Sequence, residues 1–429
     1  MEKTPKNSSK KTPIIIAIAG LIVIGGGYLG GMHYISNKTM DFLHAQADKI
    51  NASQKNHAEI QDEQRGLFTS TAKVIVSNDT SSISAPLTVR HGLFNTDIES
   101  DDVRFQDNGH NALNVLGGNA EKATLAIHLH NSSLKDNDLR GSSIALTLPS
   151  QISASENDGS RIMLDNPALK LERNSDGKLV ASMIADKVES SEDVASFSNF
   201  GHTSVSLTYD AAWSEQLMAA GSAYAHDSSE QSRQNLETVL TAHLPDIHAN
   251  IKDLKNRVSM NLPETSAEHF IIDIVRDPSS AVTRFAGNLS GIGSKGAANG
   301  NVIIKVALDQ RIVDTAMNLS HRTDSNISQD VVALAQTSPR IVLEELRMFD
   351  NEHIALSATG EASLEGSSIT SINDIGITAI IGKATIKGLP DGAAQMAEIY
   401  NIDGVKDGQP VDVTVNKGKV AINGKPLLF

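Results

Sequence analysis

Two histidines, His128 and His130, come nearest to a metal-binding pattern in this sequence, by residue type and by spacing. His128 and His130 alternate with Leu125, Ile127 and Leu129. Alternation of period two is typical of a strand, on which residues two apart share a face, so both imidazoles could bind one metal ion. No third or fourth ligand can be named, and a metal-binding histidine also needs a partner that orients its ring. We therefore favour an exposed strand face and predict no metal site.

A glycine-rich run is a second candidate. Residues 291–296 read G-I-G-S-K-G, which is the spacing of a dinucleotide fingerprint. That fingerprint links a strand to a helix, whereas a strand pattern from Val302 to Leu308 follows this run. A flexible loop is the preferred interpretation, and we predict no cofactor.

Carboxylate clusters are the third candidate, because paired acids can do acid–base work when burial shifts a pKa. Solvated loops and edges are the preferred alternative. The sequence contains no nucleophile elbow and no phosphate-binding loop, so we predict no catalytic residue. The clusters are Glu99, Asp101 and Asp102, and Glu344 with Glu345.

The composition excludes further classes of protein. The 429 residues include no cysteine, which removes disulfides, thiolate metal sites and cysteine nucleophiles. The 51 acidic residues outnumber the 37 basic ones, which gives a net charge of -14. Binding to the phosphates of nucleic acid needs a cationic surface, so we expect no nucleic-acid partner.

The N-terminal region carries the strongest signal. Residues 14–35 contain no Asp, Glu, Lys or Arg, and as a helix they are long enough to cross a bilayer core of about 30 Å. Lysines concentrate in residues 1–13, so the positive-inside rule keeps this tail in the cytoplasm and the rest of the chain on the other side. A cleaved signal peptide is the alternative, but the nearest cleavage triplet, at 45–47, lies too far beyond the apolar run.

Two glycines inside this span bear on oligomeric state. Gly26 and Gly30 are four residues apart, the spacing that lets two membrane helices approach closely. A homodimer is one interpretation. The other is that glycine is common in membrane helices, and both stay open.

Residues 36–60 are expected to form a stalk after the span. Met40, Leu43, Ala47 and Ile50 recur at helical spacing among polar residues. The sequence therefore predicts an amphipathic helix that sets the following domain off the bilayer.

Residues 61–429 are predicted to form an elongated, mainly β domain of the α+β class. Many short runs alternate with period two and are separated by turn residues, which indicates antiparallel strands. The glycine-rich stretch 287–300 is the expected hinge and puts a lobe boundary near 290.

One helical block interrupts these strands. Trp213, Leu217, Ala220 and Tyr224 form an apolar stripe, and a second helical pattern ends before Pro245. We expect a helical hairpin packed on the sheet, with helix confined mainly to 211–244 and two shorter pieces, one near Val331 to Leu334 and one after Pro390. The stripe is either ordinary core or the wall of a groove for a lipid or partner, and core is the preferred interpretation.

Three short motifs follow the predicted N-terminal anchor. They are Gln64-Arg65-Gly66-Leu67-Phe68-Thr69-Ser70, His91-Gly92-Leu93-Phe94 and Asn423-Gly424-Lys425-Pro426-Leu427. In this order they resemble the motifs of the YdgA-like family of Gram-negative envelope proteins. The resemblance implies an inner-membrane protein with a large periplasmic domain of unassigned function, and it brings no catalytic residues. The family tends to have proline after His-Gly, where this chain has Leu93.

Arg65 is the candidate binding residue of the first motif. Gly66 permits a tight turn into the first strand, and the guanidinium could bind a carboxylate or a headgroup phosphate. Phosphate recognition usually recruits several cations, so a structural turn with a surface arginine is the preferred alternative.

Two classes of function remain. The first is a non-enzymatic envelope factor that binds protein or lipid through its long sheet, and the second is an unrecognised periplasmic hydrolase. We favour the first, because strands are plentiful and no nucleophile–base pair can be named from the sequence.

Overall fold

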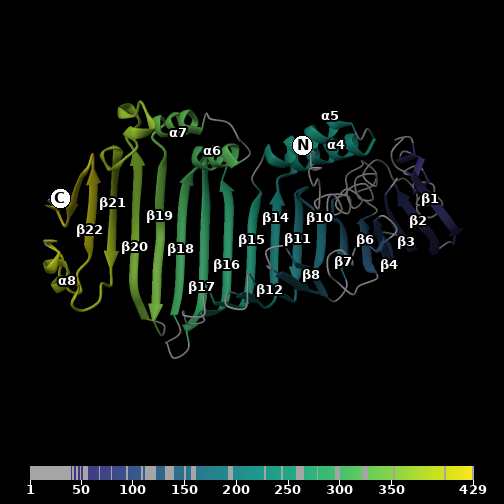
Figure 1. Ribbon diagram of the computed structural model, residues 1–429, viewed down its shortest axis with the longest axis horizontal. Coiled ribbons are helices and arrows are strands. Elements are labelled where there is room, and N and C mark those ends of the chain that lie inside the picture. Colours follow the sequence, from purple (N-terminus) through teal and green to yellow (C-terminus); the bar gives the residue numbers. More distant parts are fainter. Residues whose placement is uncertain are drawn as a thin grey trace, which may run out of the picture. The chain divides into compact units, whose positions relative to one another are not determined.

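The computed structural model divides the chain into two compact units. Figure 1 labels the helices and strands of both units. One unit contains the described residues up to Phe197 together with His202–Pro245, and the other contains Ser198–Gly201 and the chain from Asp246 onward. The structure describes residues 40–427 except 41–42, 45–46, 49, 52–56, 67, 79, 93–94, 108–109, 112–121, 131–139, 149–150, 156–160, 192–196, 227–228, 243–244, 258–264, 278, 295–299, 321–326, 351–352 and 401.

An antiparallel sheet forms the frame of the first unit. Its strands pair in the order β1-β2-β3-β4-β6-β7-β10-β11-β14. This is the order along the chain, with the shorter strands of this region left out. The strands are β1 (His57–Gln64), β2 (Thr69–Ser77), β3 (Ser81–His91), β4 (Asn95–Asp107), β6 (Ala123–His130), β7 (Ser142–Thr147), β10 (Ala168–Arg173), β11 (Leu179–Ala185) and β14 (Thr203–Tyr209).

Shorter strands complete the first half of the chain. A smaller ribbon pairs β9 with β8 on one side and with β12 on the other, and β5 pairs with the end of β4. These strands are β5 (His110–Asn111), β8 (Gln151–Ser155), β9 (Arg161–Asp165), β12 (Lys187–Ser191) and β13 (Phe197–Phe200).

The core of the first unit lies on one face of its sheet. Val89 pairs with Ile98, and Ile98 pairs with Ile127, so the three side chains share a face and are at most 6% exposed. The described positions between 40 and 51 are helical and lie over this face. Met40, at 0% exposed, and Ala47 are buried. We call these helical positions the 40–51 segment.

The predicted helical hairpin is present as α4 (Ala211–His226) and α5 (Glu230–Ala242), which pack against each other. Asp210 Oδ1 accepts the backbone N–H of Trp213 at 2.8 Å, which caps the start of α4. The Trp213 ring stacks on Tyr209 of β14 at 3.7 Å, and its Nε1 donates to the carbonyl of Val239 at 2.9 Å. The hairpin is thus tied to the sheet through the stacking of the buried Trp213 on the half-buried Tyr209.

The second unit is a meander of long antiparallel strands. They pair in chain order from β15 to β24, and two helices are inserted between β18 and β19. The strands are β15 (Asp246–Arg257), β16 (Thr265–Asp277), β17 (Val282–Ser294), β18 (Gly300–Asp309), β19 (Arg340–Asp350), β20 (His353–Leu364), β21 (Ile380–Lys387), β22 (Val411–Asn416), β23 (Lys419–Ile422) and β24 (Lys425–Pro426).

The helices of the second unit are short. The inserted pair is α6 (Gln310–Ser320) and α7 (Ile327–Gln336), and α8 (Ala393–Ile399) precedes β22. Single 3-10 turns stand at η3 (Gly366–Ser368), η4 (Ile372–Asp374) and η5 (Ile377–Ala379). The predictions near α7 and α8 are confirmed, whereas α6 was not predicted, although Ile312, Val313 and Ala316 have helical spacing.

The glycine-rich stretch 287–300 is not the hinge that the sequence suggested. Its described residues form the end of β17 and the start of β18. Gly291 has φ +65 at a register shift between Leu289 and Ile292, so this glycine serves a β-bulge. The division between the units lies at Pro245/Asp246 and not near residue 290.

The start of the domain also differs from the expected boundary. β1 begins at His57, inside the range 36–60 predicted as a stalk, and the apolar residues of the 40–51 segment pack on the sheet. The predicted span 14–35 lies outside the described residues. None of the helices in the described part of the chain has the length and apolar composition needed to cross a membrane.

The packing of Trp213 predicts a stability effect. Trp213→Ala removes a side chain that is 1% exposed and leaves a cavity, so the free energy of unfolding should fall by about 3 to 5 kcal/mol. Trp213→Phe keeps the stacked ring and loses the indole hydrogen bond, so it should cost about 1 kcal/mol. Urea unfolding of the full chain, followed by circular dichroism, measures both. An unchanged midpoint for Trp213→Ala would contradict the core role.

Candidate functional site

The second unit carries a continuous apolar sheet face. Opposite residues of an antiparallel pair point to the same side, so Ile304 shares a face with Leu346, Leu346 with Ala358, and Ala358 with Ile386. We call this side of β15–β22 the apolar face. Across its centre it comprises Phe270, Ile272 and Ile274 on β16, Phe285 and Leu289 on β17, Val302, Ile304, Val306 and Leu308 on β18, Ile341, Leu343, Leu346 and Met348 on β19, and Leu356, Ala358 and Ala362 on β20.

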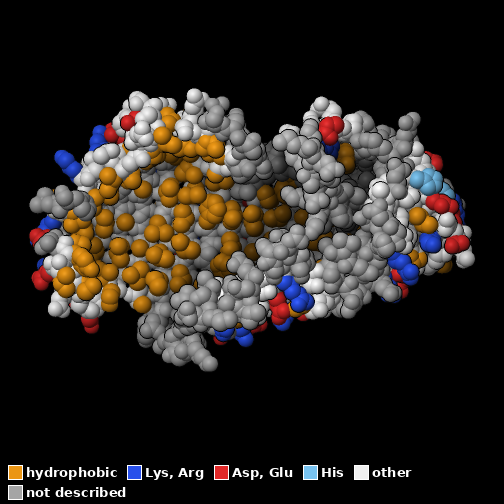
Figure 2. Space-filling view, viewed as in Figure 1, with side chains coloured by type: hydrophobic (Ala, Val, Ile, Leu, Met, Phe, Trp, Pro, Cys, Tyr) orange, Lys and Arg blue, Asp and Glu red, His pale blue; other side chains and the backbone are white. Residues whose placement is uncertain are grey.

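Large side chains on the apolar face stand open to solvent. Ile304 is 42% exposed, Ile341 44% and Met348 43%. Figure 2 shows hydrophobic side chains gathered over the strands of the second unit. Single exposed hydrophobics are ordinary, but a contiguous apolar surface on a folded protein marks a binding site.

The helices of the second unit leave the centre of this face uncovered. The helices α6 and α7 contact each other, and beyond that α6 contacts β17 and β18 while α7 contacts η3 and η4. A small core of Ala335, Ile369 and Ala379 lies beside α7, away from the centre of the apolar face. Most of the fully buried apolar residues described in this unit are alanines.

The opposite face of the same sheet is charged and ion-paired. Lys305 Nζ lies 2.7 Å from Glu345, and this hydrogen bond is the main cause that lowers the pKa of Glu345. Arg284 bridges Asp277 at 3.0 Å and Glu344 at 3.2 Å. The sheet therefore has one charged, hydrophilic face and one apolar face.

A serine–histidine contact is the second feature of interest, and it lies in the first unit. Ser70 Oγ is 2.9 Å from His91 Nε2. Ser70 is 1% exposed and His91 8%. Such a contact is what a nucleophile and its base require. Its members come from two of the motifs that carried the family resemblance, and the β2–β3 pairing brings the motifs together.

The burial of this pair favours a structural role. Ser70 Oγ also accepts the N–H of Gly66 at 3.3 Å, so the hydroxyl ties two turns together. A side chain on Gly66 or Gly92 would collide with the backbone oxygen of Thr69 or Asn95, at 2.2 Å and 2.7 Å, which explains both glycines. His91 Nδ1 is buried and has no hydrogen-bond partner within the described ranges, so no group there orients the ring as in a catalytic triad.

The remaining predicted site residues lie apart from one another. Arg65 is ion-paired with Glu63, which also contacts His44 of the 40–51 segment. Trp213 is buried against the sheet and Tyr224 is half-buried on α4. The structure does not bring these residues together, and Gly26 and Gly30 lie outside the described residues.

The histidines and acids singled out in the sequence have ordinary partners. His128 and His130 lie on the strand face opposite the leucines, as predicted, and His128 Nδ1 is 2.5 Å from Asp97. No cluster that could hold a metal ion occurs among the residues with described positions. Asp102 is held by Arg104 at 2.8 Å, and this hydrogen bond is the main cause that lowers its pKa, so the carboxylate stays ionised.

Comparison with known proteins gives one partial match. Residues 10–104 match a family described as a bacterial protein of unknown function (DUF945). The matched range contains the predicted span, the 40–51 segment and two of the three motifs. It is compatible with the YdgA-like resemblance, which stays a prediction. No curated protein and no solved structure matches the chain.

The buried His91 predicts a dependence of stability on pH. Burial lowers the pKa of His91 below 6.5, because the charged imidazolium loses hydration. Below pH 6.5 the unfolded chain binds this proton and the folded chain resists it, so stability is lost as pH falls from 6.5 towards the folded pKa.

His91→Gln removes the titration and keeps an amide that can hydrogen-bond Ser70. The midpoint of thermal unfolding should be higher for the parent chain at pH 7.5, and the difference should shrink as pH falls to 5.5. Midpoints measured at pH 7.5, 6.5 and 5.5 test this prediction. A difference that stays constant would show that His91 is not the responsible group.

Proposed function

We propose that this chain is a membrane-anchored, non-enzymatic binding protein of the bacterial envelope that holds lipid acyl chains on its apolar face. The observation that carries the proposal is the solvent exposure of Ile304, Ile341 and Met348 on one continuous side of a sheet whose other side is ion-paired. Covering such a face with hydrocarbon contributes about 25 cal/mol for each Å² removed from water.

The chemistry of the face favours lipid over protein. Binding sites for proteins concentrate their energy in Trp, Tyr and Arg side chains and surround them with polar groups. The paired positions across the centre of the apolar face on β17–β20 carry aliphatic residues, glycines, Thr283, Phe285 and Met348, and none of them is Trp, Tyr or Arg. An acyl chain needs only dispersion contacts and exclusion of water, and this surface supplies both.

The envelope location is part of the same proposal. The uncharged stretch 14–35 would anchor the chain in the inner membrane, with residues 1–13 in the cytoplasm and the bulk in the periplasm. The match to a bacterial family over residues 10–104 begins before this stretch and continues beyond it. A lipid-binding face on an anchored protein would stand within reach of its ligand.

The hydrolase alternative rests on the contact between Ser70 and His91. A nucleophile must reach its substrate, and an Oγ on a residue 1% exposed does not. Nor is there a partner for His91 Nδ1 among the described residues. The binding function is therefore the better supported of the two.

Photo-crosslinking tests the ligand. A benzophenone amino acid is placed at Ile304, which is 42% exposed, or at Val275, which is 45% exposed on the opposite face of the same sheet. Irradiation of living bacteria should add a lipid mass to the full chain substituted at 304, and not to the chain substituted at 275. A protein adduct, a crosslinked pair of this chain, or equal lipid yield at both positions would reject the acyl-chain proposal.

Protease accessibility tests the topology. Protease added to intact spheroplasts should digest residues 36–429 and leave a membrane-embedded stub, because the lysine-rich tail stays inside. Degradation that begins only after lysis would place the domain in the cytoplasm and remove the envelope part of the proposal.

A further inference from the structure

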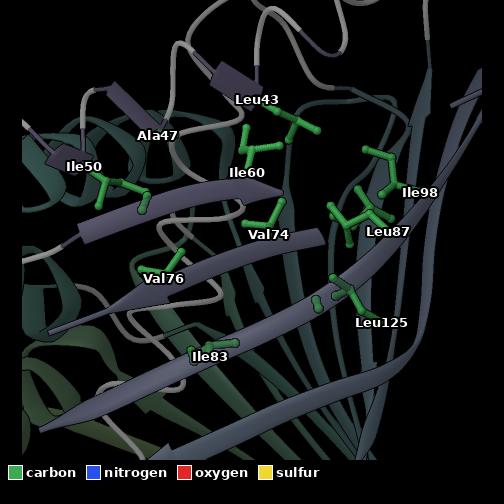
Figure 3. A pocket seen from close by; sticks show the side chains of 13 residues that line it. Leu43, Ala47, Ile50, Ile60, Val74, Val76, Ile83, Leu87, Ile98 and Leu125 are labelled. Carbon is green, nitrogen blue, oxygen red and sulfur yellow. The ribbon is translucent and has the colours of Figure 1, made fainter. Parts of the chain in front are cut away.

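A cavity with an apolar lining lies in the first unit between the 40–51 segment and the sheet (Figure 3). Leu43, Ala47 and Ile50 line it from the segment, and residues of β1, β2, β3, β4 and β6 line it from below. Every lining residue is Ala, Val, Leu or Ile. This cavity is separate from the apolar face of the second unit.

The cavity is large enough for an occupant but unsuited to water. Its volume is about 60 Å³, and one water molecule needs roughly 10–15 Å³ on the same measure. A buried water also needs two to four polar partners, which this lining does not offer. An empty apolar space leaves its lining atoms without dispersion contacts, so an apolar occupant is favoured.

The local sequence creates this space. Three lining positions that face the cavity carry alanine, namely Ala47 on the segment, Ala58 on β1 and Ala85 on β3. Each of these residues is at most 8% exposed, so each is a core position with a small side chain. Close packing would need larger side chains at such positions.

Polar contacts hold the segment over the cavity. Asn51 Nδ2 donates to the carbonyl of Ala58 at 2.9 Å, and Asn51 Oδ1 accepts its N–H at 2.7 Å. His44 Nε2 lies 2.5 Å from Glu63 Oε2. These contacts tie the segment to β1 on both sides of Ala47, so the segment is a fixed cover over an apolar chamber.

The position of the cover in the chain indicates where an occupant comes from. Only four residues separate Ile35, the end of the uncharged stretch, from Met40. Fully extended, the path from Ile35 to Met40 spans at most about 18 Å. If the stretch is anchored as proposed, the cavity stands close to the hydrocarbon of the bilayer.

We infer that this cavity binds the methyl end of an acyl chain from a membrane phospholipid. The inference rests on the proposed anchoring of residues 14–35 and does not depend on the apolar face. The aliphatic lining excludes the headgroup, which stays outside, so the site recognises hydrocarbon and is indifferent to headgroup charge.

The test uses the full chain reconstituted in vesicles of phosphatidylethanolamine whose acyl chains carry a diazirine at the methyl end. After irradiation, peptide mapping by mass spectrometry locates the adducts. We expect adducts on cavity-lining residues in 40–51 and 81–91, together with adducts in 14–35 from the anchor itself. Adducts in 14–35 without any in the lining would overturn the inference, and loss of both would overturn the anchoring.

A pair of variants sharpens the result. Ala85→Leu fills the cavity and should reduce the lining adducts at least tenfold, with the 14–35 adducts unchanged. Ala126→Leu makes the same change at an exposed position of β6 in the same sheet and should behave as the parent chain. If Ala85→Leu fails to fold, Val76→Ala widens the cavity and should increase the yield. An unchanged yield in the folded variants would overturn the inference.

Discussion

Cross-strand pairing is the constraint on which the rest of this structure depends. In an antiparallel ladder the side chains of opposite residues lie on the same face. Apolar residues that alternate along one strand therefore lie beside the apolar residues of the next strand. The sequence Ile304, Leu346, Ala358, Ile386, Val411 crosses five strands in this way, and every member is apolar. A slip of one residue in any strand would move its charged residues onto this side, which holds the register in place.

The two units differ in how far their apolar faces are covered. In the first unit the 40–51 segment and the α4–α5 hairpin lie on the sheet, and Val89 and Trp213 are almost completely buried. In the second unit Ile304, Ile341 and Met348 remain more than two-fifths exposed. Full burial of one such side chain is worth about 1.5–3 kcal/mol, and these exposed side chains contribute only part of that to folding. A contiguous exposed apolar surface also promotes aggregation unless something covers it. Retention of apolar residues there is better explained by a ligand than by folding.

Local patterns predicted the elements more successfully than their associations. The alternation in β6 and the stripe of Trp213 and Ala220 needed only short-range periodicity, and both elements are present. The prediction of a hinge at residues 287–300 was wrong, because the sequence alone does not distinguish a glycine at a β-bulge from a glycine in a linker. Only the register with β18 distinguishes the two. The Ser70–His91 contact could not be found from either motif alone, since it depends on which residue of β2 lies beside β3. The sequence also did not predict that the apolar face is uncovered. Alternation in a strand indicates that one side is apolar, but it does not indicate what covers that side.

The chemistry of the two apolar sites limits the kind of specificity this protein can have. Neither the apolar face nor the cavity lining offers a hydrogen bond at its centre, and a purely hydrophobic site discriminates weakly between ligands that differ by a methylene. Selection would then come from length and shape, through the bulk of Met348 and Leu346 and the small volume beneath Ala47. Charged groups stand outside both apolar surfaces; Glu63, near the end of β1, pairs with Arg65. Sites of this kind suit hydrocarbon-bearing molecules as a class, which is what the proposed binding of acyl chains requires.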